Sequence, residues 1–218
     1  MYQPTHFVEA RPEVLQAFVR AQPLGTLITR DRAGALQADL LPFLLERGPT
    51  PHGTLRGHVA RANPLWRDSD LDADVLVVFR GEQGYVSPAW YASKALHGKV
   101  VPTWNYAVVQ ARGRLRVVDD AAWLRGLVGR LTDHFEAARV AARPTPAAWG
   151  IDDAPPDYVE AMLRAIVGIE IDLDALAGKF KLSQNRDEAD RDGAIGGLRS
   201  LDDAGAQALA DAMQRARG

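Results

Sequence analysis

The stretch that organises this sequence runs from residue 57 to residue 106 and contains three compact phrases: Gly57-His58-Val59-Ala60-Arg61-Ala62-Asn63-Pro64-Leu65-Trp66, Tyr85-Val86-Ser87-Pro88-Ala89-Trp90-Tyr91 and Val101-Pro102-Thr103-Trp104-Asn105-Tyr106. It holds three of the five tryptophans, three of the five tyrosines and two of the four lysines. Aromatic faces, cations and small hydrogen-bonding side chains this close together favour a flat, anionic ligand.

The other two lysines form a second unusual phrase, Gly178-Lys179-Phe180-Lys181-Leu182-Ser183-Gln184-Asn185. In an extended chain the period of two places Lys179 and Lys181 on the same side. The pattern is compatible with contact to a ligand or an interface, and equally with a solvated strand edge that lysines protect from pairing. We expect a loop to carry this phrase.

Composition sets the broad class. The 218 residues are enough for one large domain or two small ones, and the 47% apolar and 25% charged fractions are those of a globular protein with a core. The chain has no cysteine, so disulfides, thiolate metal sites and cysteine nucleophiles are excluded. A net charge of −2 gives no global attraction for nucleic acid or membranes. Without a signal peptide or an apolar run of ~20 residues, we expect a cytoplasmic protein.

Hydrophobic periodicity predicts a mainly β, α+β chain. Short turns join six expected strands before residue 120, and a seventh follows later: residues 24–29, 36–45, 54–60, 74–79, 85–87, 101–118 and 167–173. Gly81–Gly84 reads as a turn, and Glu170 and Asp172 predict one solvated face. Helices are expected at 12–22, 121–139, 157–165 and 201–215, with another from 187 broken at Gly193, Gly196 and Gly197. Such strands favour an antiparallel barrel over a parallel sheet.

The first phrase predicts a strand that ends at Arg61 and a helix that begins with Asn63 as N-cap and Pro64 at the first helical position. Free N–H groups at a helix start, together with Arg61, would suit a phosphate. An ordinary capped helix with a surface arginine explains the same residues.

In the second and third phrases, Trp90, Tyr91, Trp104 and Tyr106 could stack on a ring whose polar edge meets Ser87, Thr103 and Asn105. The alternative is an aromatic cluster in the core. The five histidines show no metal-ligand spacing, and no nucleophile or phosphate-loop motif is present, so we assign neither a metal site nor a catalytic residue. The arginines near residues 121–139 are more typical of a solvated helix face than of a DNA reader.

Taken together, these phrases resemble the PaiB-like family, which comprises FMN-binding negative transcriptional regulators similar to pyridoxamine-phosphate oxidases and flavin reductases. The matching pieces occur in the expected order along nearly the whole chain: Met1-Tyr2 with Pro4, His6 and Phe7, then 57–66, 85–91, 101–106, and Gly168-Ile169-Glu170-Ile171 followed by 178–185. The match is specific as a set.

The resemblance implies a six-stranded antiparallel FMN-binding split barrel with flanking helices, working as a homodimer with the flavin nucleotide at the subunit interface. It implies a single domain over residues 1–218, with a barrel core at about 24–118 and 167–185, a helical insertion at about 120–165 and C-terminal helices at 187–216. The cofactor contacts it implies are His58, Val59, Ala60, Arg61, Asn63, Ser87, Trp90, Lys94, Thr103, Trp104, Asn105, Lys179, Lys181, Ser183 and Gln184.

The sequence is compatible with three hypotheses for the function of the chain. The first is an FMN-binding regulator of the PaiB type, for which neither charge nor motif supports direct DNA contact. The second is an FMN-dependent oxidoreductase or flavin reductase acting on an unknown small molecule, with the chemistry supplied by the flavin. The third is a dimer whose site takes another planar anion, such as haem or pyridoxal phosphate.

Overall fold

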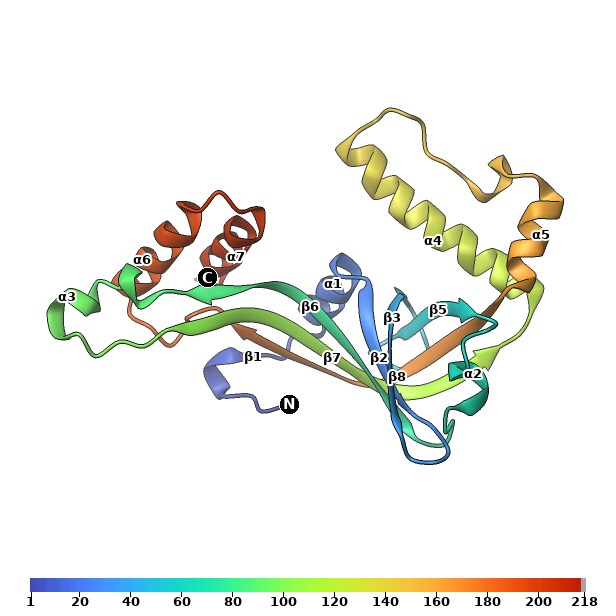
Figure 1. The fold of residues 1–218 in the computed structure, drawn as a ribbon, viewed down its shortest axis with the longest axis horizontal. Helices are drawn as coiled ribbons and strands as arrows, with labels where there is room; N and C mark the ends of the chain where they lie inside the picture. The colour runs from blue at the N-terminus through green and yellow to red at the C-terminus, as the bar shows by residue number, and fades with distance from the viewer. Residues whose placement is uncertain (217–218) are drawn as a thin grey trace. The chain divides into compact units, whose positions relative to one another are not determined.

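The structure is a computed structural model that describes residues 1–216. Its strands are β1 (Val8–Glu9), β2 (Leu24–Arg30), β3 (Leu36–Pro42), β4 (Leu44–Glu46), β5 (Thr54–Ala60), β6 (Asp74–Val86), β7 (Thr103–Val118) and β8 (Ile166–Lys181) (Figure 1). Its α-helices are α1 (Pro12–Ala21), α2 (Leu65–Asp68), α3 (Ser93–His97), α4 (Ala121–Ala142), α5 (Pro156–Arg164), α6 (Glu188–Arg199) and α7 (Ala204–Arg215). Single 3-10 turns occur at Thr5–Phe7, Pro88–Trp90 and Ile151–Asp153.

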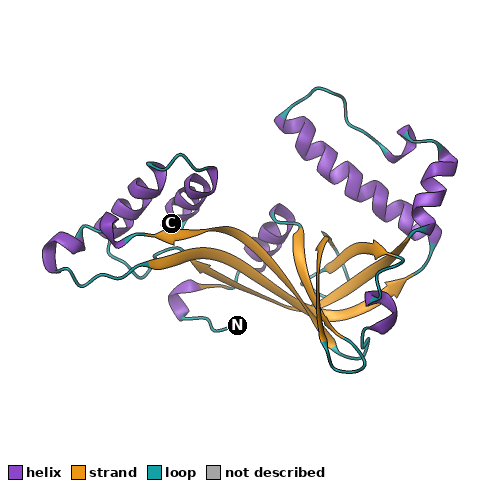
Figure 2. Ribbon diagram, viewed as in Figure 1, coloured by secondary structure: helices purple, strands orange, loops and turns teal. Residues whose placement is uncertain are grey.

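All eight strands belong to one sheet, in the order β3-β2-β6-β7-β8-β5-β4, with β1 paired to β8 (Figure 2). The pairs β1–β8, β2–β3, β4–β5 and β5–β8 are antiparallel. The fold class is therefore as expected, whereas the strand count of six is wrong. The predicted strand 36–45 is divided at Phe43, whose N–H bonds to the carbonyl of Pro23, and the two-residue β1 is too short to show a sequence pattern.

Two compact units divide the chain. Unit 1 comprises Met1–Gln22, Phe79–Gln110 and Ala177–Gly218, and unit 2 comprises Pro23–Val78 and Ala111–Leu176. The long strands β6, β7 and β8 each contribute residues to both units. The single-domain assignment stays a prediction, and each unit is described by itself below.

Unit 2 packs its half of the sheet against helical residues. Its strand core includes the fully buried Leu27, Leu55 and Val77. Asp120 caps α4 by accepting a hydrogen bond from the N–H of Trp123, as its acidic position before the apolar periodicity predicts. One face of α4 then buries Leu127 against Leu44. At 22 residues α4 is the longest helix among residues 1–216, and no helix there combines the length and the apolar character needed to span a bilayer.

Two acidic residues of β8 in unit 2, Glu170 and Asp172, are paired rather than solvated. Glu170 is buried, and its two carboxylate oxygens accept hydrogen bonds from Arg56 Nε at 2.5 Å and Arg116 Nη2 at 2.9 Å. Asp172 accepts a hydrogen bond from Thr54 and lies 3.2 Å from Arg116. The expected solvated face is wrong for Glu170, because cross-strand arginines cover this end of the strand.

Unit 1 has its own core. In α1, Pro12 occupies the first helical turn and Leu15 and Val19 are buried, as the sequence pattern predicts. The helices α6 and α7 pack on each other through Leu198, Leu209 and Met213.

The predicted turn at Gly81–Gly84 and the predicted helix break at Gly193, Gly196 and Gly197 are both wrong. β6 is continuous through Gly81 and Gly84, and a Cβ at Gly81 would stand 2.7 Å from the ring of Phe18. α6 is likewise continuous through the predicted break at Gly193, Gly196 and Gly197, and a Cβ at Gly197 would stand 2.2 Å from the indole of Trp90. Gly81 and Gly197 each admit a neighbouring aromatic ring, a need that the sequence alone does not distinguish from a turn.

Candidate functional site

The Lys179 phrase belongs to a strand and not to a loop, because β8 runs on to Lys181. Lys181 Nζ donates hydrogen bonds to Thr103 Oγ1 and, at 2.7 Å, to the carbonyl of Trp104, both at the start of β7. Burial lowers the pKa of Lys181 below its ordinary value, with the positive charge of Lys179 adding to the effect. A partly buried ammonium beside a second cation gains from a nearby anion, so this strand end favours an anionic ligand.

Lys179 lies among aromatic rings. Its Nζ stands 5.5 Å from the ring centroid of Tyr2 and 5.5 Å from that of Tyr106. The N-terminal arm is held here because Val8 pairs with Lys179 and the Gln3 amide donates to the carbonyl of Gly178 at 2.8 Å. Sequence reasoning missed Tyr2 as a site residue, although the Met1-Tyr2 start was one of the matching pieces.

We call Tyr2, Trp104, Tyr106, Lys179 and Lys181 the lysine face. Trp104 is 53% exposed and meets Tyr85, itself 52% exposed, edge-on at 6.5 Å. Within residues 1–216 no ion pair joins either lysine to a carboxylate. Exposed rings beside cations that lack an acidic partner are suited to a flat anion.

The turn after β8 is built by the predicted residues themselves. Asn105 is fully buried and donates from Nδ2 to Ser183 Oγ at 2.8 Å, while Ser183 has the left-handed φ of 66°. Gln184 accepts from the N–H of Leu182 and donates to the carbonyl of Phe180. These contacts support a positioning role for Asn105, Ser183 and Gln184 beneath the lysine face.

Asn105 also has a free acceptor. Among the described residues its Oδ1 has no hydrogen-bond partner, although the atom is buried. An orphaned buried oxygen is uncommon and costs free energy, which marks this position as one shaped by something besides packing.

The remaining predicted residues of unit 1 lie elsewhere in that unit. Ser87 Oγ accepts from the N–H of Ala89 and caps the 3-10 turn. Trp90 packs its indole on the glycines of α6, and Tyr91 is buried, so both are core aromatics. Lys94 is exposed on α3, a five-residue helix between the second and third phrases.

The predicted phosphate corner belongs to unit 2, and its arginine is occupied. The Arg61 guanidinium makes a two-point contact with Asp119, at 2.8 and 2.5 Å, and donates to the carbonyls of Arg164 and Ile166. These bonds hold the pKa of Asp119 below its ordinary value. A phosphate would have to displace Asp119, so the phosphate contact at Arg61 stays a prediction.

The other corner residues have structural partners as well. Asn63 caps the first turn of α2 by accepting from the N–H of Leu65, although the helix begins one residue later than expected, and its amide donates to Asp39. His58, Val59 and Ala60 pair with β8, and Val59 is buried. Burial lowers the pKa of His58 below its ordinary value. Because α2 has only four residues, it offers little of the helix-terminus field that a phosphate needs.

Comparison with known proteins decides the family. Residues 1–175 match the family model described as "Putative FMN-binding domain". The chain belongs to this FMN-binding family. The match stops before Lys179, so the two lysines lie outside the matched residues. They lie within the alignment to the protease synthase and sporulation protein PAI 2 of Bacillus subtilis, which is 30% identical and covers 98% of this chain and 97% of that protein.

Further comparisons give a fungal relative and two solved structures. An uncharacterized protein of Emericella nidulans is 35% identical, over 92% of this chain and 91% of that protein. Among solved structures, a flavocytochrome from Azotobacter vinelandii has a TM-score of 0.58 at 16% identity, covering 80% of this chain and 69% of that chain. An FAD and heme binding protein from Mycobacterium smegmatis has a TM-score of 0.53 at 21% identity, covering 86% and 78%. At these identities the two structures show a shared fold.

FMN is the cofactor that the family supports, and the lysine face fits it. The cofactor is a flat ring system with an anionic tail, and the face presents exposed rings with two cations that lack acidic partners. When bound, FMN would supply hydride and electron transfer. The residues of the chain would bind and orient it.

Proposed function

We propose that the chain binds FMN on the lysine face of unit 1 and works as a flavin-dependent protein of the PaiB type. The observation that carries this proposal is the pair Lys179 and Lys181, each against aromatic or hydroxyl groups and neither joined to a carboxylate in residues 1–216. Lys181 meets an anionic portion of the cofactor, and the exposed ring of Trp104 stacks on its flat portion.

Asn105, Ser183 and Gln184 position the turn beneath this face. Ser87, Trp90 and Lys94 contribute less, because Ser87 and Trp90 have partners in their own unit and Lys94 is solvated. The corner from His58 to Asn63 serves the phosphate in this proposal only if Arg61 exchanges Asp119 for it.

The proposal includes a homodimer. In unit 2 the register of β2 and β3 places Leu24, Leu36 and Leu40 on one face of the hairpin, since Thr26 pairs with Leu40 and Arg30 with Leu36. These leucines are 56%, 70% and 61% exposed. An exposed leucine stripe across the hairpin at the β3 edge of the sheet is suited to a second copy of the chain. Leu40→Glu is expected to convert a dimer to a monomer in sedimentation-velocity runs, whereas a wild type that sediments as a monomer contradicts this part.

The regulatory role is supported by the likeness to PAI 2, whose name refers to protease synthesis and sporulation. The net charge of −2 and the ion pairs that Arg125, Arg130 and Arg139 make with Asp152, Glu46 and Glu136 leave little basic surface on α4 for DNA. Regulation would therefore act through a protein partner. A mobility shift on promoter DNA that persists across a salt series would overturn this view.

The second candidate, an FMN-dependent oxidoreductase, is favoured by the flavocytochrome likeness and by Lys181. A cation near the ring raises the affinity of a flavin for electrons. Reduction of bound FMN by NADH or NADPH faster than that of free FMN would support it. If no physiological donor reduces the bound flavin, this candidate fails.

The deciding experiment is a titration of the purified chain with FMN, followed by quenching of flavin fluorescence. Lys181→Met is expected to weaken FMN roughly ten- to a hundredfold, the scale of a lost charged hydrogen bond. Lys179→Met is expected to weaken it less, because a cation–π arrangement holds the lysine beside the ligand without a direct bond. Lys99→Met removes the same charge from an exposed loop of unit 1 and serves as control. Equal affinities for Lys181→Met and Lys99→Met would remove the lysine face from the site.

A further inference from the structure

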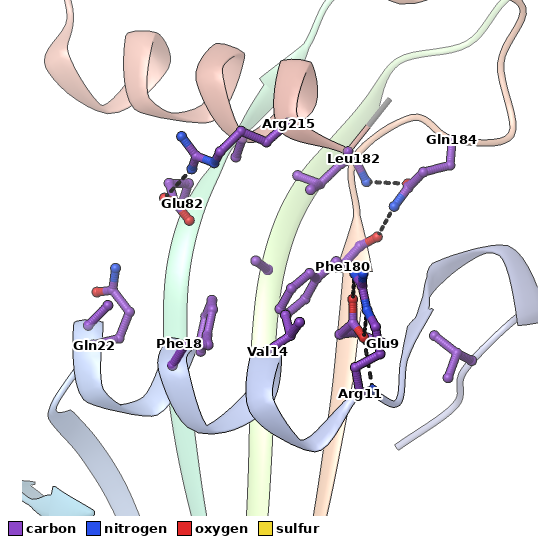
Figure 3. A pocket seen from close by; sticks show the side chains of 16 residues that line it. Glu9, Arg11, Val14, Phe18, Gln22, Glu82, Phe180, Leu182, Gln184 and Arg215 are labelled. Atoms are coloured by element: carbon purple, nitrogen blue, oxygen red, sulfur yellow. Dashed lines mark hydrogen bonds and ion pairs between the residues drawn. The ribbon is translucent and has the colours of Figure 1, made fainter. Parts of the chain in front are cut away.

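Unit 1 contains a cavity of about 460 Å³ between α1 and α7, over the strands β6, β7 and β8 (Figure 3). The strand register separates it from the lysine face. Phe180 lines the cavity, whereas its neighbours Lys179 and Lys181 point to the other face of β8. In β7 Ala107 lines it, and the adjacent Tyr106 meets Lys179. The volume lies in the range of natural small-molecule sites.

The middle of the cavity is apolar. The rings of Phe18 in α1 and Phe180 in β8 lie with centroids 5.3 Å apart and planes inclined by 37°. Around them are Val14 and Leu182, and the space is left open by small side chains at Ala17, Ala21, Ala107 and Ala212. Such a surface takes an apolar body, and a ring can pack on one face of the phenylalanine pair.

Polar groups lie at both ends of the cavity, and the two ends differ in how fully the arginine is paired with its carboxylate. At one end Arg11 closes on Glu9 through two side-chain hydrogen bonds, at 2.9 and 2.6 Å, and a third from its backbone N–H (Figure 3). At the other end Arg215 makes one contact of 3.4 Å with Glu82. The Arg215 side chain is 68% exposed and that of Glu82 is 24% exposed. Arg215 therefore keeps N–H donors that Glu82 does not engage, and its side chain is more exposed than that of Glu82.

We propose that this cavity binds a small apolar molecule that carries one anionic group, with its apolar body against Phe18 and Phe180 and its anion on Arg215. Glu82 holds Arg215 in place, and the closed Glu9–Arg11 pair limits the cavity at the far end. A cationic ligand on Glu82 is disfavoured, because Arg215 covers that carboxylate. The cavity lies on the opposite face of β8 from Lys179 and Lys181, and Gln184, which holds the turn after β8, is the lining residue that the two regions share.

The test uses two fluorescent probes on the full chain, with FMN present at saturation. Anilinonaphthalene sulfonate is a flat apolar anion, and N-phenylnaphthylamine is a neutral molecule of nearly the same shape. Ala17→Trp, at an exposed position of α1 that lines the cavity, fills the space. Arg215→Gln removes the cation. The controls are Ala189→Trp on an exposed position of α6 and Arg20→Gln on α1, neither of which lines the cavity.

The expected result is binding of one sulfonate probe per chain. Ala17→Trp weakens both probes at least tenfold, whereas Arg215→Gln weakens the sulfonate about five- to tenfold and the neutral probe less than twofold. The controls leave both affinities unchanged. The proposal is overturned if the sulfonate does not bind, if it binds only when FMN is left out, or if Ala17→Trp and Ala189→Trp have equal effects.

Discussion

The strand β8 carries alternating charged residues at both of its ends, and the two ends treat that charge differently. In unit 2, Glu170 and Asp172 face arginines and a threonine that satisfy their carboxylates. In unit 1, Lys179 and Lys181 face aromatic rings, a hydroxyl and a carbonyl. Within residues 1–216 no carboxylate forms an ion pair with either lysine. Charge that is neutralised internally stabilises the fold, whereas charge left open is available to a ligand.

The largest effect is expected at the neutralised end. Glu170→Gln keeps the shape of the side chain but leaves Arg56 and Arg116 without the carboxylate they share. We expect the free energy of unfolding to fall by about 1.5–3 kcal/mol, because each arginine loses a charged hydrogen bond while Arg56 keeps Glu46 and Arg116 keeps Asp172. Denaturant unfolding measures this, with Asp174→Asn on an exposed position of the same strand as control. A loss no larger than that of the control would mean that the network contributes nothing.

The open end should behave in the opposite way. Lys181→Met removes a partly buried cation, and the groups it leaves, Thr103 Oγ1 and the Trp104 carbonyl, lie at a strand end that water can reach. We expect the free energy of unfolding to change by less than ~1 kcal/mol while FMN affinity falls strongly. Measuring both quantities on the same preparation sharpens the contrast. A stability loss as large as that of Glu170→Gln would show that Lys181 is structural.

A substitution at Arg61 tests whether this charge, like that of Glu170, serves the fold or, like that of Lys181, is available to a ligand. Its donors are engaged by Asp119 and two carbonyls, so we expect Arg61→Gln to weaken FMN less than threefold. Arg67→Gln, at a nearby exposed arginine on α2, is the matched control for the fluorescence titration. A tenfold loss confined to Arg61→Gln would restore the phosphate corner predicted from the sequence.

The smallest effect is a pH dependence. Since the pKa of Lys181 lies below its ordinary value of 10.5, FMN affinity is expected to decline as pH rises through that lowered pKa and the ammonium is lost. Stability has the opposite sign. In that window the unfolded chain binds more protons, so the free energy of unfolding rises with pH. Titrations between about pH 7 and pH 10 should show a slope that Lys181→Met removes.

Much of this structure follows from local sequence. The start of α1 at Pro12, the cap of α4 at Asp120 and the strands β2, β5 and β7 follow from periodicity and capping chemistry. The errors share one physical cause. Gly81 and Gly197 admit the rings of Phe18 and Trp90, and Glu170 meets Arg56 from 114 residues earlier. In each case the deciding partner is distant in the chain, so the local pattern carries no trace of it.

The candidate site could be predicted only in part, because some of its contacts also join residues that are distant in the chain. Lys181 contacts Thr103 and Trp104 because the end of β8 lies beside the start of β7. That these residues and Lys179 bind FMN stays a prediction. Trp90 and Tyr91 were predicted as stacking residues from their residue type alone. In the structure Tyr91 is buried in the hydrophobic core and Trp90 packs against it. Tyr2 was missed as a contact, since only the pairing of β1 with β8 brings the N-terminal arm to Lys179.

The passage of β6, β7 and β8 through both units sets an order of events during synthesis. Every segment of unit 2 has been made once Leu176 has left the ribosome, whereas unit 1 also needs α6 and α7, which follow it in the chain. Unit 2 can therefore fold first while the chain is still growing, and the lysine face is completed later. A chain that stops at Leu176 keeps Glu170 and Asp172 and lacks Lys179 and Lys181.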